Sequence, residues 1–172
     1  MCIRDSDQAR RLAEHWAETG RTFDWVVASS LVRARETAEI VAGGLGLPVE
    51  VSDLWMERDN GPLAGLSPEE AATKFPESAN RSRWAPLTAL GGESRQGLHA
   101  RASGALEDAL VREHERILVV AHGGILDAAL RILLGTSEKA YFPFGDTGFA
   151  ELALDASDHV QLISFGPNPA LA

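Results

Sequence analysis

The sequence is poor in cysteine and has no long hydrophobic run. Its 172 residues include a single cysteine, Cys2. One thiol excludes an intramolecular disulfide and a cysteine-based zinc site, because both need at least two thiols. No apolar run approaches the roughly 20 residues that cross a bilayer, and no signal-peptide pattern is visible. We therefore expect a cytoplasmic protein with no membrane partner.

Positive charge is also scarce. The chain carries 16 lysines and arginines against 25 acidic residues, a formal net charge of −9. Binding to a nucleic-acid backbone needs clustered basic residues, so we expect no nucleic-acid partner. A small phosphorylated substrate remains compatible, since a few arginines dominate the field at short range. We expect no cofactor and no metal site, because no second histidine stands at ligand spacing from His122. Nothing in the sequence indicates an oligomeric state.

The length is that of a single domain with its own core. Residues 1–6, M-C-I-R-D-S, carry no pattern that joins them to the rest of the chain. They resemble translated adapter or vector DNA, and we expect them to be a non-native leader. The expected domain covers residues 7–172.

Apolar periodicity predicts helices alternating with strands. The expected helices cover residues 7–19, 31–47, 67–75, 96–115 and 124–135, and the expected strands cover 25–30, 49–51, 117–121, 149–154 and 159–165. Ser29 or Ser30 is expected to cap the second helix, and Ser67 the third. Strands separated by helices predict a three-layer α/β/α fold with a mostly parallel central sheet, and the last two strands are expected to form a hairpin.

Two strand-to-helix junctions stand out as places for a site. They are V-V-A-S-S-L-V-R-A (26–34) and V-V-A-H-G-G-I-L (119–126). Sites in open α/β sheets gather at the carboxyl ends of strands. Alone, Arg33 is more often a solvated helix residue and His122 a structural histidine. If the junctions are neighbours, Arg33, His122 and the N–H groups around Gly123 converge on one point. That arrangement suits a phosphate.

Four segments, in this order, resemble the histidine phosphatase superfamily, which includes cofactor-dependent phosphoglycerate mutases. They are S-S-L-V-R-A-R-E-T-A (29–38), E-R-D-N-G-P-L-A-G (57–65), G-G-E-S (91–94) and H-G-G (122–124). The resemblance implies phosphoryl transfer through a phosphohistidine. It makes Arg33 a phosphate clamp, His122 a second, positively charged histidine and Glu57 the acid and base.

Three further residues lie in these segments with their roles open. Arg58 could contact a substrate carboxylate or face solvent. Glu93 and Ser94 could line the pocket or cap the next helix. In the family, the segment from about 57 to 95 forms a lid over the substrate. Here it is short, which favours a phosphomonoester hydrolase over a phosphoglycerate mutase-type phosphotransferase.

The chain departs from the family at the nucleophile. In the family a histidine in an R-H-G motif ends the first strand, which is central in the sheet. Ile3-Arg4-Asp5 faintly resembles this motif, but Asp5 takes the place of the histidine. We therefore expect the nucleophile and the first strand to be missing, two strand edges to be left unpaired or forced together, and this truncated chain to have no turnover. The alternative is a non-catalytic phosphate-binding fragment or paralogue.

Overall fold

The computed structural model describes residues 3–76, 91–137 and 139–167. Five strands and five α-helices are assigned in these ranges, with two short 3₁₀ helices. The helices are α1 (Ile3–Glu18), α2 (Val32–Leu45), η1 (Asp53–Trp55), η2 (Gly61–Leu63), α3 (Pro68–Lys74), α4 (Arg95–Leu110) and α5 (Gly123–Leu133). The strands are β1 (Trp25–Ser29), β2 (Glu50–Ser52), β3 (Ile117–Val120), β4 (Phe149–Leu154) and β5 (Val160–Gly166).

The first three strands form a parallel sheet in the order β2-β1-β3. Val27 of β1 lies opposite Glu50 on one side and Val119 on the other. β4 and β5 form a separate antiparallel pair, with Leu152 opposite Leu162. The α/β fold with a parallel sheet is thus confirmed, but the last hairpin does not extend that sheet.

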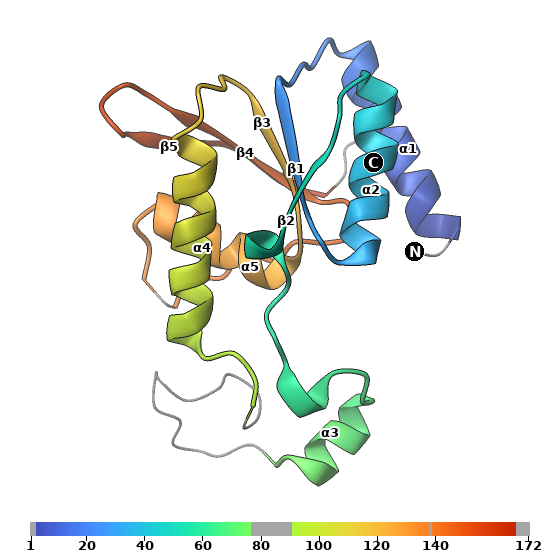
Figure 1. Ribbon diagram of the computed structural model, residues 1–172, viewed down its shortest axis with the longest axis vertical. Coiled ribbons are helices and arrows are strands. Elements are labelled where there is room, and N and C mark those ends of the chain that lie inside the picture. The colour runs from blue at the N-terminus through green and yellow to red at the C-terminus, as the bar shows by residue number, and fades with distance from the viewer. Residues whose placement is uncertain (1–2, 77–90, 138, 168–172) are drawn as a thin grey trace.

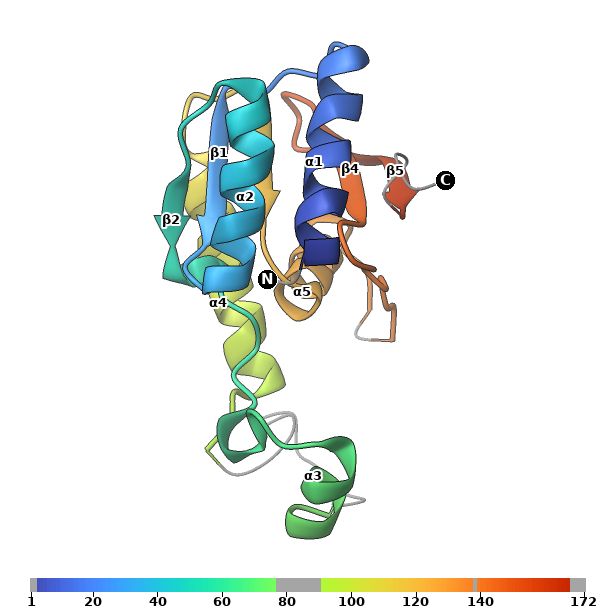
Figure 2. The ribbon, with the colours of Figure 1, turned by 90° about the vertical axis from the view of Figure 1, so that its right-hand side faces the viewer.

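Helices cover both faces of the parallel sheet, as Figures 1 and 2 show. One core cluster joins the sheet to α4 and α5 and includes Val27, Leu98 and Ile125. The other cluster joins Leu12 of α1 to Val41 of α2, with Leu118 and Phe149 packed against it. The side chains of β1, the central strand, are all buried, because helices cover the two faces from which they project. Those of β3 are only half-buried, because β1 is its one partner among the strands the structure describes.

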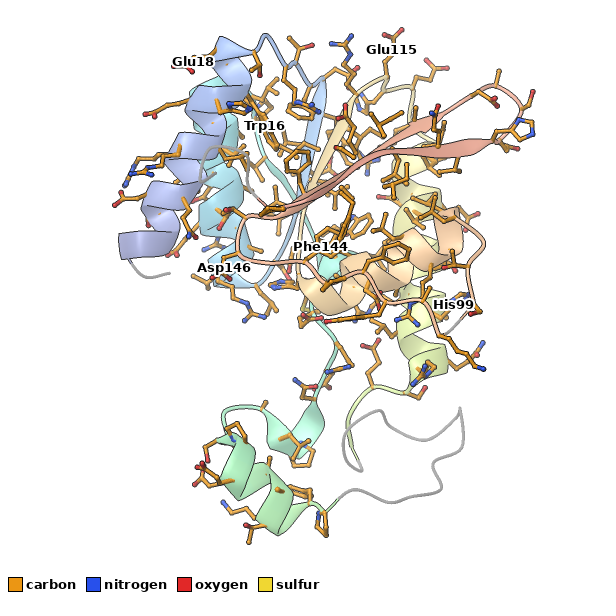
Figure 3. The ribbon with its side chains drawn as sticks, turned by 180° about the vertical axis from the view of Figure 1, so that it is seen from behind. Trp16, Glu18, His99, Glu115, Phe144 and Asp146 are labelled. Atoms are coloured by element: carbon orange, nitrogen blue, oxygen red, sulfur yellow. The ribbon has the colours of Figure 1, made fainter. Side chains whose placement is uncertain are left out.

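Trp16 connects α1 to the β4–β5 pair. Its side chain projects from α1 towards the interior (Figure 3). The ring packs against Phe23 at 5.2 Å and meets Phe149 edge-on at 5.9 Å between centroids. Such pairs of aromatic rings stabilise the fold by more than the burial of their surface alone.

Several boundaries differ from the expectations. α1 begins at Ile3, four residues earlier than expected, so the helix includes residues 3–6. α4 ends at Leu110, before the polar residues 112–116. The N-cap of α2 is Leu31, with no side-chain cap, so neither serine caps that helix. Ser67 does cap α3, in a capping box with Glu70.

The segment expected to form a lid leaves the layers after η1. η2 and α3 lie away from the sheet (Figure 2), and residues 77–90 lie outside the described residues. In the ranges that the structure describes, no helix combines the length and the apolar character needed to cross a membrane.

Truncating the centre of β1 tests the packing. Val27 is fully buried in the cluster with α4 and α5. Val27→Ala should lower the free energy of unfolding by about 2 kcal/mol, because it removes buried methyl groups and leaves a cavity. The control is Val51→Ala in β2, where the side chain is 45% exposed. Denaturant titration should find little change in the control, and equal losses would contradict this core.

Candidate active site

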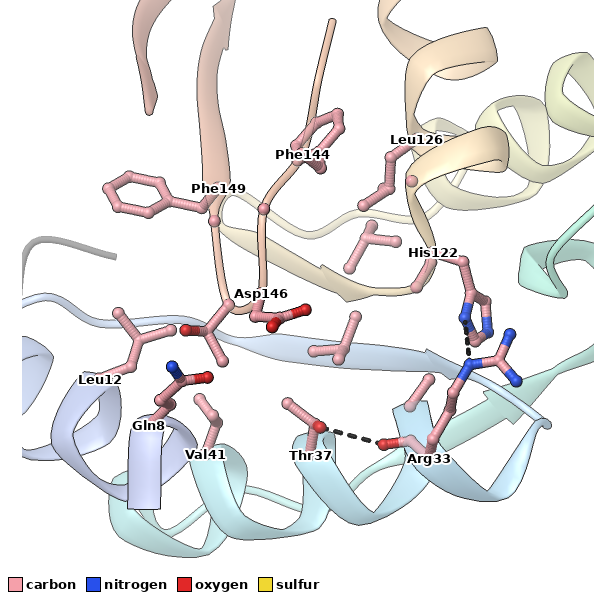
Figure 4. Close-up of a pocket in the computed structure, with 18 of the residues that line it drawn as sticks. Gln8, Leu12, Arg33, Thr37, Val41, His122, Leu126, Phe144, Asp146 and Phe149 are labelled. Atoms are coloured by element: carbon pink, nitrogen blue, oxygen red, sulfur yellow. Dashed lines mark hydrogen bonds between the residues drawn. The ribbon is translucent and has the colours of Figure 1, made fainter. Parts of the chain in front are cut away.

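A cavity of about 370 Å³ opens where β1 and β3 end. Because these strands are adjacent and parallel, their carboxyl ends lie at the same edge of the sheet. The cavity is lined by side chains from both junctions, from α1 and from the segment that leads into β4 (Figure 4). These residues include Gln8, Leu12, Arg33, Thr37, Glu57, Val120, His122, Gly123, Phe144 and Asp146.

Arg33 and His122 are in direct contact at this edge. Arg33 lies in the first turn of α2, and Nε of its guanidinium donates to Nδ1 of His122 at 3.2 Å (Figure 4). Arg33 is exposed, whereas His122 is 8% exposed. The structure therefore brings together the two groups that the sequence placed on separate segments 89 residues apart.

Ser29 holds the other side of the same imidazole. It is the last residue of β1 and is fully buried. Its Oγ lies 2.8 Å from Nε2 of His122 and also accepts the N–H of Leu31 at 3.2 Å. The sequence suggested Ser29 as a helix cap and as the first residue of the segment 29–38, with no role in holding His122. A polar residue at the end of a fully buried strand is the signal that could have found this role.

The pKa of His122 is lowered in the ligand-free site. Burial lowers the pKa of this histidine below its ordinary value of 6.5, because desolvation penalises the charged ring. Arg33 and Arg101 lower the pKa further, and the carboxylate of Glu57 opposes them. The free site thus favours a neutral ring at neutral pH. This agrees with Nδ1 acting as an acceptor for Arg33.

Glu57 is held by backbone N–H groups. Its carboxylate accepts the N–H of Arg58 at 2.7 Å and that of Gly124, in the first turn of α5, at 3.2 Å. A Cβ on residue 124 would lie only 2.3 Å from Oε1, so the approach depends on a glycine at that position. The helix dipole adds to the attraction between this carboxylate and the start of α5.

Arg101 fixes the backbone that carries Glu57. From α4, its guanidinium donates to the carbonyl groups of Leu54, Met56 and Glu57 at 2.6–3.3 Å. Its Nε and Nη2 pair with both oxygens of Glu93 at 2.9 and 2.7 Å. Sequence reasoning missed Arg101. The available signal was its position beside the buried stripe of α4, which begins with Leu98.

The remaining expected site residues take other places. Glu93 pairs with Arg101 and accepts from the N–H of Asp59 at 3.3 Å. Ser94 caps α4 through the N–H of Gly97. Neither is among the residues that line the cavity. Arg58 donates to Asn60 and lines a second cavity, of about 610 Å³, which also borders Glu57 and Gly123.

The two glycine-containing loops meet at Gly61. A Cβ there would lie 2.5 Å from the backbone nitrogen of Gly92, and φ of Gly61 is +55°. Both facts require glycine. The contact joins the segment after Glu57 to the turn before Glu93, so two of the four sequence segments support each other.

No metal centre accompanies these groups in the part of the chain that the structure describes. There, no three His, Cys, Asp or Glu residues gather in a way that could hold a metal ion. His122 is the one histidine of the five that lines the cavity with Arg33.

The parallel sheet, the paired arginine and histidine, and the two helix N-termini at one edge make an α/β site whose groups are suited to hold an anion. Residues 4–161 match the family model of the histidine phosphatase superfamily (branch 1). The chain belongs to this superfamily, as its four segments indicated.

Relatives in the superfamily include enzymes of two kinds. The chain is 34% identical over 134 residues to a 2,3-bisphosphoglycerate-dependent phosphoglycerate mutase of Azorhizobium caulinodans, covering 73% of this chain and 65% of that protein. It is 41% identical over 138 residues to a metal-independent phosphoserine phosphatase of Arabidopsis thaliana, covering 76% and 57%. The chain thus spans less than two thirds of the length of these relatives.

Solved structures share the fold. A mycobacterial glucosyl-3-phosphoglycerate phosphatase superposes with a TM-score of 0.82 at 24% identity, covering 98% of this chain and 88% of the other. The α-ribazole phosphatase of Shigella flexneri gives a TM-score of 0.82 at 21% identity, covering 99% and 84%.

The contact at Gly61 can be tested against a matched glycine. Gly65 also has a positive φ, of +83°, but nothing lies within 4 Å of a Cβ there. Gly65→Ala should cost about 1–2 kcal/mol from backbone strain alone. Gly61→Ala should cost about 2 kcal/mol more, because its methyl group meets backbone. Thermal or denaturant unfolding measures both, and equal losses would argue against the contact.

The lowered pKa of His122 gives a second test. Proton NMR titration should place its midpoint below that of an exposed histidine. Arg33→Met keeps a long side chain but removes the charge, so the midpoint should rise. It should stay below 6.5, because burial is the larger cause. Arg35→Met is the control: Arg35 is exposed on the same helix and lies 3.6 Å from Glu39. An unchanged midpoint in Arg33→Met would contradict the electrostatic coupling.

Proposed function

We propose that the protein is a phosphomonoester hydrolase that binds a small phosphorylated compound between Arg33 and His122 and acts in the cytoplasm. The contact between these two groups, in a cavity that Glu57 also lines, is the observation that carries the proposal. It supplies charge, hydrogen-bond donors and a helix N-terminus at one point, against a negative overall charge.

The proposed binding mode uses each group for one part of the phosphate. Arg33 donates to phosphate oxygens from the first turn of α2, and His122 donates once its Nδ1 carries a proton. Gly123, the first residue of α5, also lines the cavity, and its N–H would supply a further donor. These donors stabilise charge that builds on the oxygens during transfer, where the loss of one donor costs about 3 kcal/mol.

The reaction proceeds in two displacements. A neutral histidine nitrogen attacks phosphorus, and the bond to the leaving oxygen breaks as Glu57 gives that oxygen a proton. Water then attacks the phosphohistidine, Glu57 takes a proton from the water, and the bond between nitrogen and phosphorus breaks to release phosphate. In this scheme Gly124 and Arg58 hold Glu57 through the N–H groups described above.

We further propose that the attacking histidine is not among the five of this sequence. His122 is engaged on both ring nitrogens, and the other four do not line its cavity. A strand ending in R-H-G could supply the nucleophile. It would fit beside β3, whose residues Leu118, Val119 and Val120 form one wall of the cavity. The segment 144–149 also lines the cavity.

A hydrolase is favoured over a mutase by the brevity of the segment between Glu57 and Gly92. A mutase must hold a second phosphorylated compound and exclude water, which takes a larger covering segment. Arg58 lines the neighbouring cavity and is available to contact the part of the substrate beyond the phosphate.

Phosphate binding tests the site without requiring turnover. Inorganic phosphate should bind the chain in calorimetry. Arg33→Gln and His122→Ala should each weaken binding at least tenfold, which corresponds to about 1.4 kcal/mol. Arg35→Gln should bind as the wild type does. Absence of binding, or equal binding by all variants, would overturn the proposed site.

Hydrolysis of p-nitrophenyl phosphate tests the nucleophile separately. The 172-residue chain should give no turnover, and a version with an R-H-G strand ahead of residue 7 should be active. In that version His122→Ala should lower the rate by about 10²- to 10³-fold. Turnover by the 172-residue chain that is lost in His122→Ala would refute the proposal that a further histidine is needed.

A further inference from the structure

We infer that Ser29 is a positioning residue, which anchors Nε2 of His122 so that Nδ1 is the nitrogen that meets the phosphate. The part of this inference that concerns phosphate rests on the proposed function. The anchoring of His122 by Ser29 does not depend on it. Ser29 lines neither cavity, so its effect on a ligand is indirect, and His122 is the cavity residue that its side chain contacts.

The position of the proton follows from the contacts. Nε of Arg33 can only donate, so Nδ1 of His122, at 3.2 Å, must offer a lone pair. In the neutral ring the proton is therefore on Nε2, which donates to Oγ of Ser29 at 2.8 Å. Oγ has two acceptor positions, and the N–H of Leu31 occupies the other.

Burial makes this anchor specific. The exposed fraction of Ser29 is 0%, and that of His122 is 8%. If the ring turned over, the N–H of Nε2 would lose its buried acceptor, and a buried donor without a partner costs about 1–3 kcal/mol. Ser29 thus selects one orientation of the imidazole.

The orientation determines how the site responds to an anion. A phosphate that enters beside Arg33 meets Nδ1, which carries a lone pair and must gain a proton before it can donate. The ring can accept that proton without moving, because Nε2–H keeps its bond to Ser29. The charged groups around the ring are Arg33 on α2, Arg101 on α4 and Glu57 after η1. An anion adds negative charge to this set and favours the protonated ring.

Nitrogen NMR measures both the position of the proton in the free imidazole and the gain of a proton when phosphate binds. In ¹⁵N-labelled protein, with the ring signals assigned through their loss in His122→Gln, the neutral ring should show a protonated Nε2 and an unprotonated Nδ1. Saturating inorganic phosphate should protonate Nδ1 while Nε2 keeps its proton. A free ring protonated on Nδ1 would overturn the anchoring, whether or not phosphate binds. Bound phosphate with Nδ1 left unprotonated would overturn the coupling.

Substitution at Ser29 distinguishes positioning from general stability. Ser29→Ala should lower phosphate affinity about tenfold, and Ser29→Thr, which keeps the hydroxyl, should restore it. Ser30→Ala removes the neighbouring hydroxyl and should bind as the wild type does. Wild-type affinity in Ser29→Ala would overturn the inference. If that variant does not fold, the ring-nitrogen measurement on the wild type still decides. If wild-type protein binds no phosphate, the proposed function fails, while the free-ring signals still test the anchor.

Discussion

The contact between Arg33 and His122 depends on one constraint, the parallel pairing of β1 with β3. Because the strands run in the same direction with Val27 opposite Val119, both chains leave the sheet at one edge. Each then begins a helix, so two helix N-termini, a guanidinium and an imidazole face the same 370 Å³ cavity. A shift of one residue in this register would turn the side chains of β3 to the opposite face.

Loops, rather than helices or strands, bring the carboxylate of Glu57 to this edge of the sheet. Glu57 follows β2 and η1, and no regular element fixes its position. Arg101 holds this loop in place by donating hydrogen bonds to its backbone carbonyl groups, and the carboxylate of Glu93 neutralises the charge of the arginine. Partly buried charges of this kind are costly unless they are paired and hydrogen-bonded, as these are. The glycines at 61 and 124 allow the approaches that a Cβ would prevent.

Much of this could be predicted from the sequence, and the failures have physical reasons. Apolar and alternating runs located the five strands of the described residues, and Ser67 marked the start of α3. The motifs found Arg33, Glu57 and His122 because each sits at a strand exit or in a loop with a recognisable pattern. The sequence did not reveal that Ser29 binds an imidazole rather than a helix end, since that choice depends on which strands are neighbours. It also could not show that burial and nearby arginines lower the pKa of His122 in the free site, because these are tertiary properties. The separation of β4 and β5 from the parallel sheet likewise depends on packing between distant segments.

The membership of the chain in the histidine phosphatase superfamily and the geometry of its cavity support one proposal, that Arg33 and His122 share a single tetrahedral anion. A crystal structure with inorganic phosphate or orthovanadate would decide this. We expect the ion at the exits of β1 and β3, with its oxygens within hydrogen-bond distance of the Arg33 guanidinium and of Nδ1 of His122. An ion bound elsewhere, with the contact between Arg33 and His122 intact and the cavity empty, would contradict it.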